Sequence, residues 1–416
     1  MFIIIKTIKQ SPHPQIHKST TMRILQLCKK FPYPIKDGEV IAITNLAKAY
    51  KKLGAEVHLL CINTPKHFYD KSDLPDSFNF YKTIQSIPVD TDLKPSRAFL
   101  NLFSTKSYHI DRFVNDKFSK KIIKTLEIIK PEIVQMETLF LAPYVDLIRK
   151  HSNAKIVMRA HNVEHEIWSR ITDNTSSFFK KKYLAYLTRK LKNFELQQLN
   201  SYDLLVPITQ RDLATFQQLG FAGEHQVTPI GIDHQRYQPV PFDPDQPLSI
   251  SFIGSLDWIP NLEGMDWFIK NAWPTIRAAF PELTLHLAGR NTPDHLHELI
   301  SQKVIVHGEV PDAKDFINQH PVMIVPLLSG SGMRVKILEG MALGRVVITT
   351  SIGLEGIEAQ HKKEVLIADT AAEWFQCLKF CQEHNEALSH IGAAAQNLIR
   401  EHYDNLEIGQ RLLTRF

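Results

Sequence analysis

The stretch SGSGMRVKILEGMALGRVVITT, from Ser329 to Thr350, decides the fold class of this chain. It follows VMIVPLL at Val322–Leu328, an apolar segment that predicts a buried strand, and it ends in a second such segment at Arg345–Thr350. Strand, glycine-rich loop, helix and strand form a βαβ unit, which directs free backbone N–H groups toward an anion. Gly344 stands where a glycine commonly ends a helix.

The loop and the first helical turn predict an anion-binding site. Arg334 and Lys336 bring two cations into that turn, although the helix macrodipole favours negative charge there. A bound diphosphate would supply the missing negative charge. The small residues of the loop let a phosphate approach the backbone closely: Ser329, Gly330, Ser331 and Gly332.

Composition places the chain among folded intracellular proteins. With 416 residues and 44% hydrophobic content it is long enough for two or three domains. A net charge of +5 is too small to indicate nucleic acid binding, and it suits acidic small ligands or an anionic membrane surface. No apolar run approaches the roughly 20 residues of a membrane span. The four cysteines form no zinc pattern and indicate thiols in a reducing compartment: Cys28, Cys61, Cys377 and Cys381.

The first residues do not form a convincing signal peptide, because their apolar part is short and no small-residue cleavage site follows. We expect residues 1–21 to be a disordered extension and the folded chain to begin at Met22. We also expect the protein to be cytoplasmic.

Strand and helix signals alternate along the rest of the chain, which predicts parallel sheets covered by helices. The alternation restarts after the proline-dotted stretch Pro239–Pro247, so we expect an α/β protein with two doubly wound domains facing each other across a cleft. The longer predicted helices are Glu39–Leu53, Ile122–Ile129, Tyr144–His151, Phe178–Asn200, Thr209–Gly220 and Leu262–Phe280.

Three predicted strands of the second half end in glycine, namely at Gly254, Gly289 and Gly308. Their recurrence at carboxyl ends indicates a ligand crevice. Neither GxGxxG nor GxxxxGK[ST] follows a strand, which argues against a nicotinamide dehydrogenase and a P-loop enzyme.

Glu339 lies three residues after Lys336 and admits two interpretations. The pair can be a surface ion pair on one helix face. Alternatively, Arg334 and Lys336 contact phosphates while Glu339 accepts hydrogen bonds from a ribose diol, as acidic residues do in dinucleotide sites.

The sequence resembles a known family from about Met22 to its end. GSGMRVKILEGMALGRVVITTSIGLEGI and FIGSLDWIPN are similar to the donor-binding segment and the opening strand of the second domain in GT-B fold glycosyltransferases of the retaining family 4 type. HNVEHEIWSR and TPIGID are similar to the histidine motif and the interdomain segment of that group.

The resemblance implies a domain division. It implies an acceptor-side Rossmann-like domain at 22–205, a nucleotide-sugar-binding domain at 206–386 with a linker at about 235–247, and a terminal helix at 387–416 that returns to the first domain.

The resemblance also assigns roles to residues. Glu339 would hold the ribose, Arg334 and Lys336 would lie beside the diphosphate, and Ser329–Gly332 would contact phosphate or the transferred sugar. By the same resemblance, Gly254 and the residues Gly353 and Leu354 of SIGLEGI would contact the substrate. Ser331 stands where the family commonly has a first glutamate, so a carboxylate that contacts the sugar is absent.

Two positions of the first half follow from the same resemblance. His161 would face the donor sugar and stabilise positive charge in the transition state, whereas a structural role is the ordinary one for a lone histidine, including His165. Gly38 matches one of two successive glycines beside donor phosphate or acceptor, and Glu39 replaces the second.

The basic, aromatic segment FFKKKYLAYLTRKLKNF begins at Phe178. It is either a solvated helix face or a contact, over about 178–192, with anionic lipid at the inner face of a membrane.

These patterns lead to a prediction of function. We expect a metal-independent hexosyltransferase without cofactor that moves a sugar from a nucleotide-diphosphate donor to a saccharide or lipid-linked acceptor, in polysaccharide or glycolipid synthesis. The resemblance implies retention at the anomeric carbon, with the departing diphosphate taking the acceptor proton. A sugar-nucleotide 2-epimerase and a non-catalytic nucleotide-sugar-binding protein remain alternatives.

Overall fold

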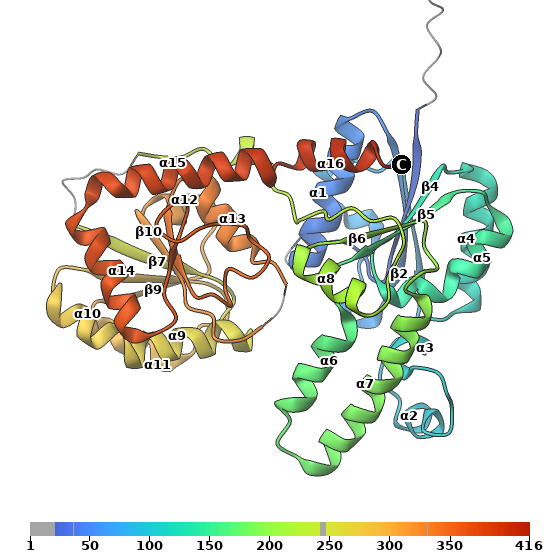
Figure 1. Cartoon of the computed structure of the whole chain (residues 1–416), viewed down its shortest axis with the longest axis horizontal. Coiled ribbons are helices and arrows are strands. Elements are labelled where there is room, and N and C mark those ends of the chain that lie inside the picture. Colours follow the sequence, from blue (N-terminus) through green and yellow to red (C-terminus); the bar gives the residue numbers. More distant parts are fainter. Residues whose placement is uncertain (1–20, 36, 242–246, 331) are drawn as a thin grey trace, which may run out of the picture.

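The structure is a computed structural model that describes residues 21–35, 37–241, 247–330 and 332–416. Figure 1 shows two α/β domains, joined by an extended segment and by the last two helices. Each domain contains a six-stranded sheet in which all the strand pairs are parallel. The predicted α/β class with two Rossmann-like sheets is confirmed. The predicted disordered extension, apart from Thr21, lies outside the described residues.

The first sheet has the order β3-β2-β1-β4-β5-β6, so its strand order reverses between β1 and β4. Its inner strands are buried along nearly their whole length, as parallel strands covered on both faces must be. The strands are β1 Arg23–Cys28, β2 Glu56–Asn63, β3 Thr83–Pro88, β4 Ile133–Met136, β5 Lys155–Ala160 and β6 Leu204–Pro207.

Helices cover both faces of this sheet, and two of them extend beyond it (Figure 1). Asp37 begins the first helix by accepting a hydrogen bond from Val40 N at 2.9 Å. The helices are α1 Gly38–Lys52, α2 Pro95–Asn101, α3 Tyr108–Asp111, α4 Asp116–Ile129, α5 Val145–His151, α6 Glu164–Asp173, α7 Phe178–Gln198 and α8 Gln210–Gln218. Short 3₁₀ helices are η1 Pro65–His67, η2 Lys71–Asp73, η3 Asp76–Phe78 and η4 Leu139–Tyr144.

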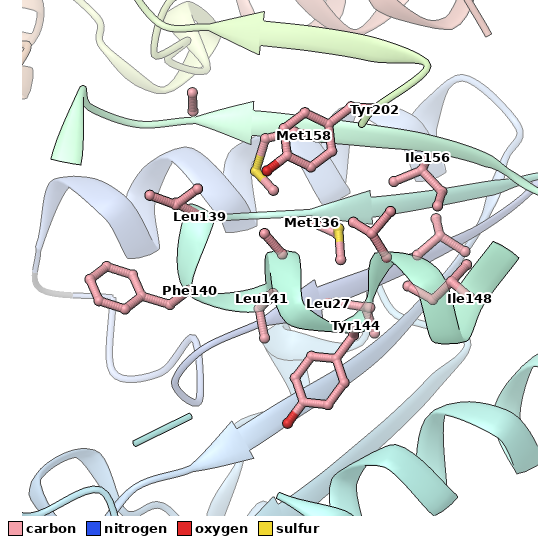
Figure 2. Packing of buried hydrophobic residues seen from close by; sticks show 14 of the residues in the cluster. Leu27, Met136, Leu139, Phe140, Leu141, Tyr144, Ile148, Ile156, Met158 and Tyr202 are labelled. Carbon is pink, nitrogen blue, oxygen red and sulfur yellow. The ribbon is translucent and has the colours of Figure 1, made fainter. Parts of the chain in front are cut away.

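One core of the first domain lies beneath η4. Figure 2 shows Leu141 and Tyr144 of η4 packed against Met136 of β4, next to Ile156 of β5. Because η4 begins three residues after β4 ends, it covers the sheet close to the carboxyl ends of its strands.

The second sheet has the order β12-β11-β10-β7-β8-β9 and reverses between β10 and β7. Its strands are β7 Ser249–Ile253, β8 Thr284–Ala288, β9 Val304–Gly308, β10 Val322–Val325, β11 Val346–Thr349 and β12 Leu366–Ile367. Its helices are α9 Ile259–Asn271, α10 Trp273–Ala279, α11 Asp294–His297, α12 Ala313–Asn318, α13 Val335–Ala342 and α14 Ala371–Glu383, with η5 His234–Arg236 before the domain and η6 Glu298–Gln302 inside it.

The helix predicted at Leu262–Phe280 is two helices. α9 ends at Asn271 and α10 begins at Trp273. Pro274 explains the break, because proline has no N–H to continue the helical bonding and its ring collides with the preceding turn.

The predicted boundary after residue 205 falls inside β6 and needs correction. Strand β6 continues to Pro207, and Leu213 and Phe216 of α8 lie in the core of the first domain together with Phe221. The first core therefore extends past residue 220, because α8 buries its apolar face on the first sheet.

The terminal helices α15 Asn385–His402 and α16 Asn405–Leu413 span both domains (Figure 1). Helix α15 packs on α13, and α16 packs on α1 of the first domain. Between them the chain runs beside the interdomain segment: Ile232 N donates to Tyr403 O at 2.8 Å, and Asn405 N donates to Ile232 O at 3.0 Å. The two chain crossings between the domains therefore lie side by side.

Candidate functional site

The glycine-rich loop connects β10 to α13 at the point where the second sheet reverses its order. Gly330 and Gly332 have φ angles of +111° and +80°, which glycine adopts without strain. Ser329 Oγ donates to Glu263 Oε2 at 2.8 Å, and the predicted contact residue Ser331 lies outside the described residues. The two glycine turns therefore lead the chain into the start of α13, the end of a helix that favours an anion.

Lys336, in the helix that follows β10, reaches the end of the neighbouring strand β7. Its Nζ donates to Asn261 Oδ1 at 2.8 Å and stands 4.5 Å from the centre of the Phe252 ring. A methyl group at Gly254 would lie 2.5 Å from Nζ, so glycine at that position makes room for the ammonium group. Burial and, to a smaller extent, the charge of Arg334 lower the pKa of Lys336 to about 7, although Glu339 opposes the shift.

The glycines that end strands in this domain are neighbours, as their recurrence in the sequence indicated. Gly254 N donates to Ala288 O at 3.0 Å, and Gly289 N donates to Gly308 O at 2.7 Å. A methyl group at Gly289 would lie 1.8 Å from Gly254 O. These close backbone approaches bring the ends of β7, β8 and β9 to one edge of the site.

Arg334 is buried beside the loop. Its Nη1 donates to Gly332 O, and its guanidinium lies 6.0 Å from the centre of the Trp258 ring. Burial lowers the pKa of Arg334, and the acidic Glu355 opposes that shift. The arginine therefore lies inside the interdomain region rather than in bulk water.

Glu339 has a partner other than Lys336. Its Oε1 accepts a hydrogen bond from the Tyr237 hydroxyl at 2.8 Å, and burial raises the pKa of its carboxyl group. Both Lys336 and Glu339 are partly buried, and each binds a different side chain. The surface ion-pair interpretation is therefore wrong, whereas the ribose role stays a prediction.

Gly353 and Leu354 lie in the turn after β11. Gly353 N donates to Thr350 Oγ1 at 2.9 Å, and Leu354 N donates to Thr350 O at 3.0 Å. A methyl group at Gly353 would lie 3.3 Å from Val325 O, so the turn packs against the end of β10. This places the two residues beside the strand that carries the glycine-rich loop.

His161 follows β5 and is held by a buried carboxylate. Its Nε2 lies 3.0 Å from Glu137 Oε2, and Glu137 follows the neighbouring strand β4. Glu137 also accepts from Gln26 and Gln135, each at 2.5 Å, and lies 3.7 Å from Arg159 Nη1. Burial alone would raise the pKa of Glu137, but the hydrogen bond from His161 and the charge of Arg159 lower it.

A charged cluster follows β1, on the same edge of the first sheet. Lys29 and Lys30 lie 3.4 Å and 3.2 Å from the Glu39 carboxylate. Burial would raise the pKa of Glu39, but the two lysines overcome it and lower the pKa to about 2. In contrast, burial raises the pKa of Glu164 to about 7, partly because Glu195 and Glu39 are near.

Glu195 of α7 accepts hydrogen bonds from the free N–H groups at the start of α6. It accepts hydrogen bonds from Glu164 N at 3.0 Å, His165 N at 3.1 Å and His165 Nδ1 at 2.6 Å. His165 therefore has a structural role at the start of α6. His161, in contrast, lies at the end of a strand and contacts Glu137.

The two domains contact each other at these strand ends. A methyl group at Gly38 would lie 4.0 Å from Val335 of α13, and one at Gly332 would lie 3.5 Å from Asn162 Oδ1. A small pocket lies at the junction, and Asn162, Arg170, Arg211, Gly332 and Glu355 are among its lining residues. Of the predicted site residues, Gly332 is among those that line this pocket, whereas His161, Lys336 and Glu339 lie outside its lining.

Sequence reasoning missed Lys29, Glu137 and Glu195. Glu137 had a signal, since it directly follows a buried strand whose neighbour ends at His161. Lys29 had the same signal after β1. No local pattern marks Glu195, because its partners lie about thirty residues earlier in the chain.

Two doubly wound parallel-sheet domains joined in this way form the GT-B fold. Residues 247–382 match the family model described as Glycosyl transferases group 1. A protein of Klebsiella pneumoniae, described as an uncharacterized 44.6 kDa protein in the cps region, is 23% identical over 282 residues, which cover 64% of this chain and 70% of that protein.

Solved structures support the same fold along nearly the whole chain. HepE of Anabaena in complex with UDP has a TM-score of 0.67 and 16% identity, covering 95% of this chain and 99% of HepE. Sucrose-phosphate synthase of Thermosynechococcus elongatus has a TM-score of 0.67 and 14% identity, covering 94% and 98%. The predicted GT-B fold is confirmed, and residues 247–382 are similar to the group 1 glycosyl transferases. Assignment to family 4 stays a prediction.

Proposed function

We propose that the protein transfers a sugar from a nucleoside diphosphate sugar to a saccharide or lipid-linked saccharide, with retention at the anomeric carbon. The observation that carries this proposal is the position of Lys336. This residue lies in the first turn of α13, directly after the glycine-rich loop, and its ammonium group lies beside Gly254 at the end of β7. Two cations and free helix N–H groups at a switch point are the arrangement that binds a diphosphate.

The donor is proposed to be a uridine nucleotide. The structural neighbour HepE binds UDP and UDP-glucose, and it covers nearly the whole chain. The relative in a cps region supports a role in cell-surface polysaccharide synthesis. Glu339 is proposed to accept hydrogen bonds from the ribose, with Tyr237 holding the carboxylate in place.

The chemistry follows from the charges. When the bond between the sugar and the diphosphate breaks, negative charge develops on the leaving oxygens, and Arg334, Lys336 and the start of α13 stabilise it. Preorganised donors of this kind typically contribute a few kcal/mol each to lowering the barrier. On the opposite side, His161 is proposed to face the sugar, with its ring held by the contact with Glu137.

Metal independence is part of this proposal. The cations occupy the position at the diphosphate where a divalent ion would otherwise act. The described residues contain one Asp-x-Asp triplet, Asp90–Asp92, after the edge strand β3, where Asp90 lies 2.5 Å from Lys94. Turnover that is equal before and after treatment with EDTA is expected.

The decisive experiment is a panel of UDP-, GDP-, ADP- and CMP-sugars in a thermal shift assay. A ligand at 100 times its dissociation constant adds about 2.7 kcal/mol of stability, which raises Tm by several degrees. We expect the UDP-sugars to give the largest shift. Donor conversion without any acceptor would instead favour the epimerase, and binding without transfer or hydrolysis would favour a non-catalytic protein.

A further inference from the structure

Helices α6 and α7 form a hairpin that projects from the first domain, away from both sheets (Figure 1). Two aromatic rings stand at its tip: Phe178 is 63% exposed and Phe179 is 83% exposed. Their centroids lie 5.7 Å apart in an edge-to-face arrangement. Exposed single apolar residues are ordinary, but two adjacent rings at the end of a projecting hairpin form a concentrated apolar tip.

Cations surround these rings. Lys180, Lys181 and Lys182 follow directly and are all exposed, and the Lys182 ammonium group lies 4.5 Å from the centre of the Phe178 ring. From Ile171 to Lys192 the sequence contains one acidic residue, Asp173, against six cations: Lys180, Lys181, Lys182, Arg189, Lys190 and Lys192. The tip therefore combines apolar rings with a strong local excess of positive charge.

A second exposed apolar segment is fixed to the same hairpin. The segment at the end of α2 carries Leu100, 67% exposed, and Phe103, 81% exposed. The Tyr186 hydroxyl donates to Leu102 O at 2.7 Å, and Lys190 Nζ donates to Asn101 O at 2.5 Å. Helix α2 therefore lies beside α7, as Figure 1 shows. We call the hairpin surface the set Leu100, Leu102, Phe103, Phe178, Phe179, Lys180, Lys181 and Lys182.

We propose that the hairpin surface docks on an anionic lipid bilayer. Phe and Leu side chains enter the boundary between headgroups and acyl chains, while lysines beside them attract anionic headgroups. The rings and cations lie at the end of a projecting hairpin, a convex shape that suits a lipid plane. No helix in the described part of the chain has both the length and the apolar character of a bilayer span.

The hairpin also connects the docking surface with the interdomain site. Helix α6 begins three residues after His161, and its ten residues span about 15 Å. Near the far end of α6, Arg170 Nη1 donates to Gly330 O of the glycine-rich loop at 3.1 Å. A docked molecule would hold the donor loop close to the lipid surface, where a lipid-linked acceptor resides. Only this last step rests on the proposed function.

The test is flotation of the full chain with vesicles of phosphatidylcholine alone or mixed with phosphatidylglycerol. We expect the protein to float with the mixed vesicles and to stay unbound with pure phosphatidylcholine. The variant K180Q/K181Q/K182Q should partition about a hundredfold less, since each surface cation near an anionic membrane contributes about fivefold. The variant F178S/F179S should lose at least about tenfold, because two apolar side chains no longer enter the interface.

Matched controls separate a dedicated surface from general charge. K117Q/K120Q/K124Q on α4 removes the same charge from exposed lysines of the same domain, and F68S replaces a ring that is 61% exposed elsewhere in it. Both controls should float like the parent. Equal losses in control and hairpin variants, or no flotation of the parent, would overturn the proposal. UDP binding, measured separately, reports on the proposed function and should be equal in all variants.

Discussion

Glu137 Oε2 lies 3.0 Å from His161 Nε2, so a hydrogen bond joins the residues that follow two neighbouring strands, β4 and β5. Glu137 is fully buried, and His161 is 9% exposed. The carboxylate therefore favours the proton on Nε2 and holds the imidazole in one orientation. The histidine predicted from the sequence therefore has a buried acidic partner that the sequence analysis did not identify.

Replacing Glu137 with Gln should affect both stability and turnover. The variant keeps the size of the side chain but leaves the buried Arg159 without its counter-charge at 3.7 Å. We expect the free energy of unfolding to fall by about 3 kcal/mol, the usual cost of breaking a buried pair. Urea unfolding and steady-state turnover measure the two effects. His161→Gln is the control, and it should lower turnover at a smaller cost in stability. Parent-like values for Glu137→Gln would argue against the role of this pair.

Lys336→Ala should reduce turnover about a hundredfold while the fold survives, because one preorganised cation at the leaving diphosphate is lost. Lys270→Ala, on the exposed face of α9 in the same domain, is the matched control and should turn over like the parent. Circular dichroism checks folding. Unchanged turnover in a folded Lys336→Ala would remove this residue from the mechanism.

Donor binding should take up a proton above pH 7. Burial lowers the pKa of Lys336 to about 7, so at pH 8 most empty sites hold a neutral amine. A bound diphosphate favours the ammonium form and raises that pKa, so affinity should fall as pH rises through this range. Calorimetry of UDP-glucose binding in two buffers with different ionisation heats measures the uptake. It should vanish below pH 6 and in Lys336→Met, and uptake that persists in that variant would assign the proton to another group.

Glu339→Ala should weaken UDP binding about tenfold, because a carboxylate that accepts hydrogen bonds from the ribose contributes on this scale. Tyr237→Phe, which removes only the hydroxyl 2.8 Å from Glu339, should have a smaller effect. The discriminating ligand is 2′-deoxy-UDP, measured by calorimetry. If Glu339 contacts the ribose, parent and Glu339→Ala differ less for the deoxy ligand than for UDP. Identical differences for both ligands would place Glu339 elsewhere.

The sequence predicted the parts of the site that are local in the chain. The segment from Ser329 to Thr350 contains its own strand ends, glycine turns and helix start, so the geometry of the loop follows from neighbouring residues. The pairs formed over long distances were not predictable in the same way. Glu137 meets His161, and Tyr237 meets Glu339 more than a hundred residues away, only because the strand order and the path of the interdomain segment bring them together.

Two fold details were misjudged for different reasons. The break between α9 and α10 was visible as Pro274, whose missing N–H ends a helix. The boundary after residue 205 was not marked locally, because α8 has an apolar face that would suit either sheet. Its packing on the first domain shows only in the structure, where Leu213 and Phe216 lie in the core of that domain.

The adjacent chain crossings at Ile232 and Asn405 should keep the two domains together after the chain is cut between them. Because α16 belongs to the carboxyl-terminal half yet packs on α1, a protease cut anywhere from 238 to 248 leaves each half in contact with the other. Cleaved protein should elute from a sizing column as one species, and the halves produced as separate polypeptides should reassemble when mixed.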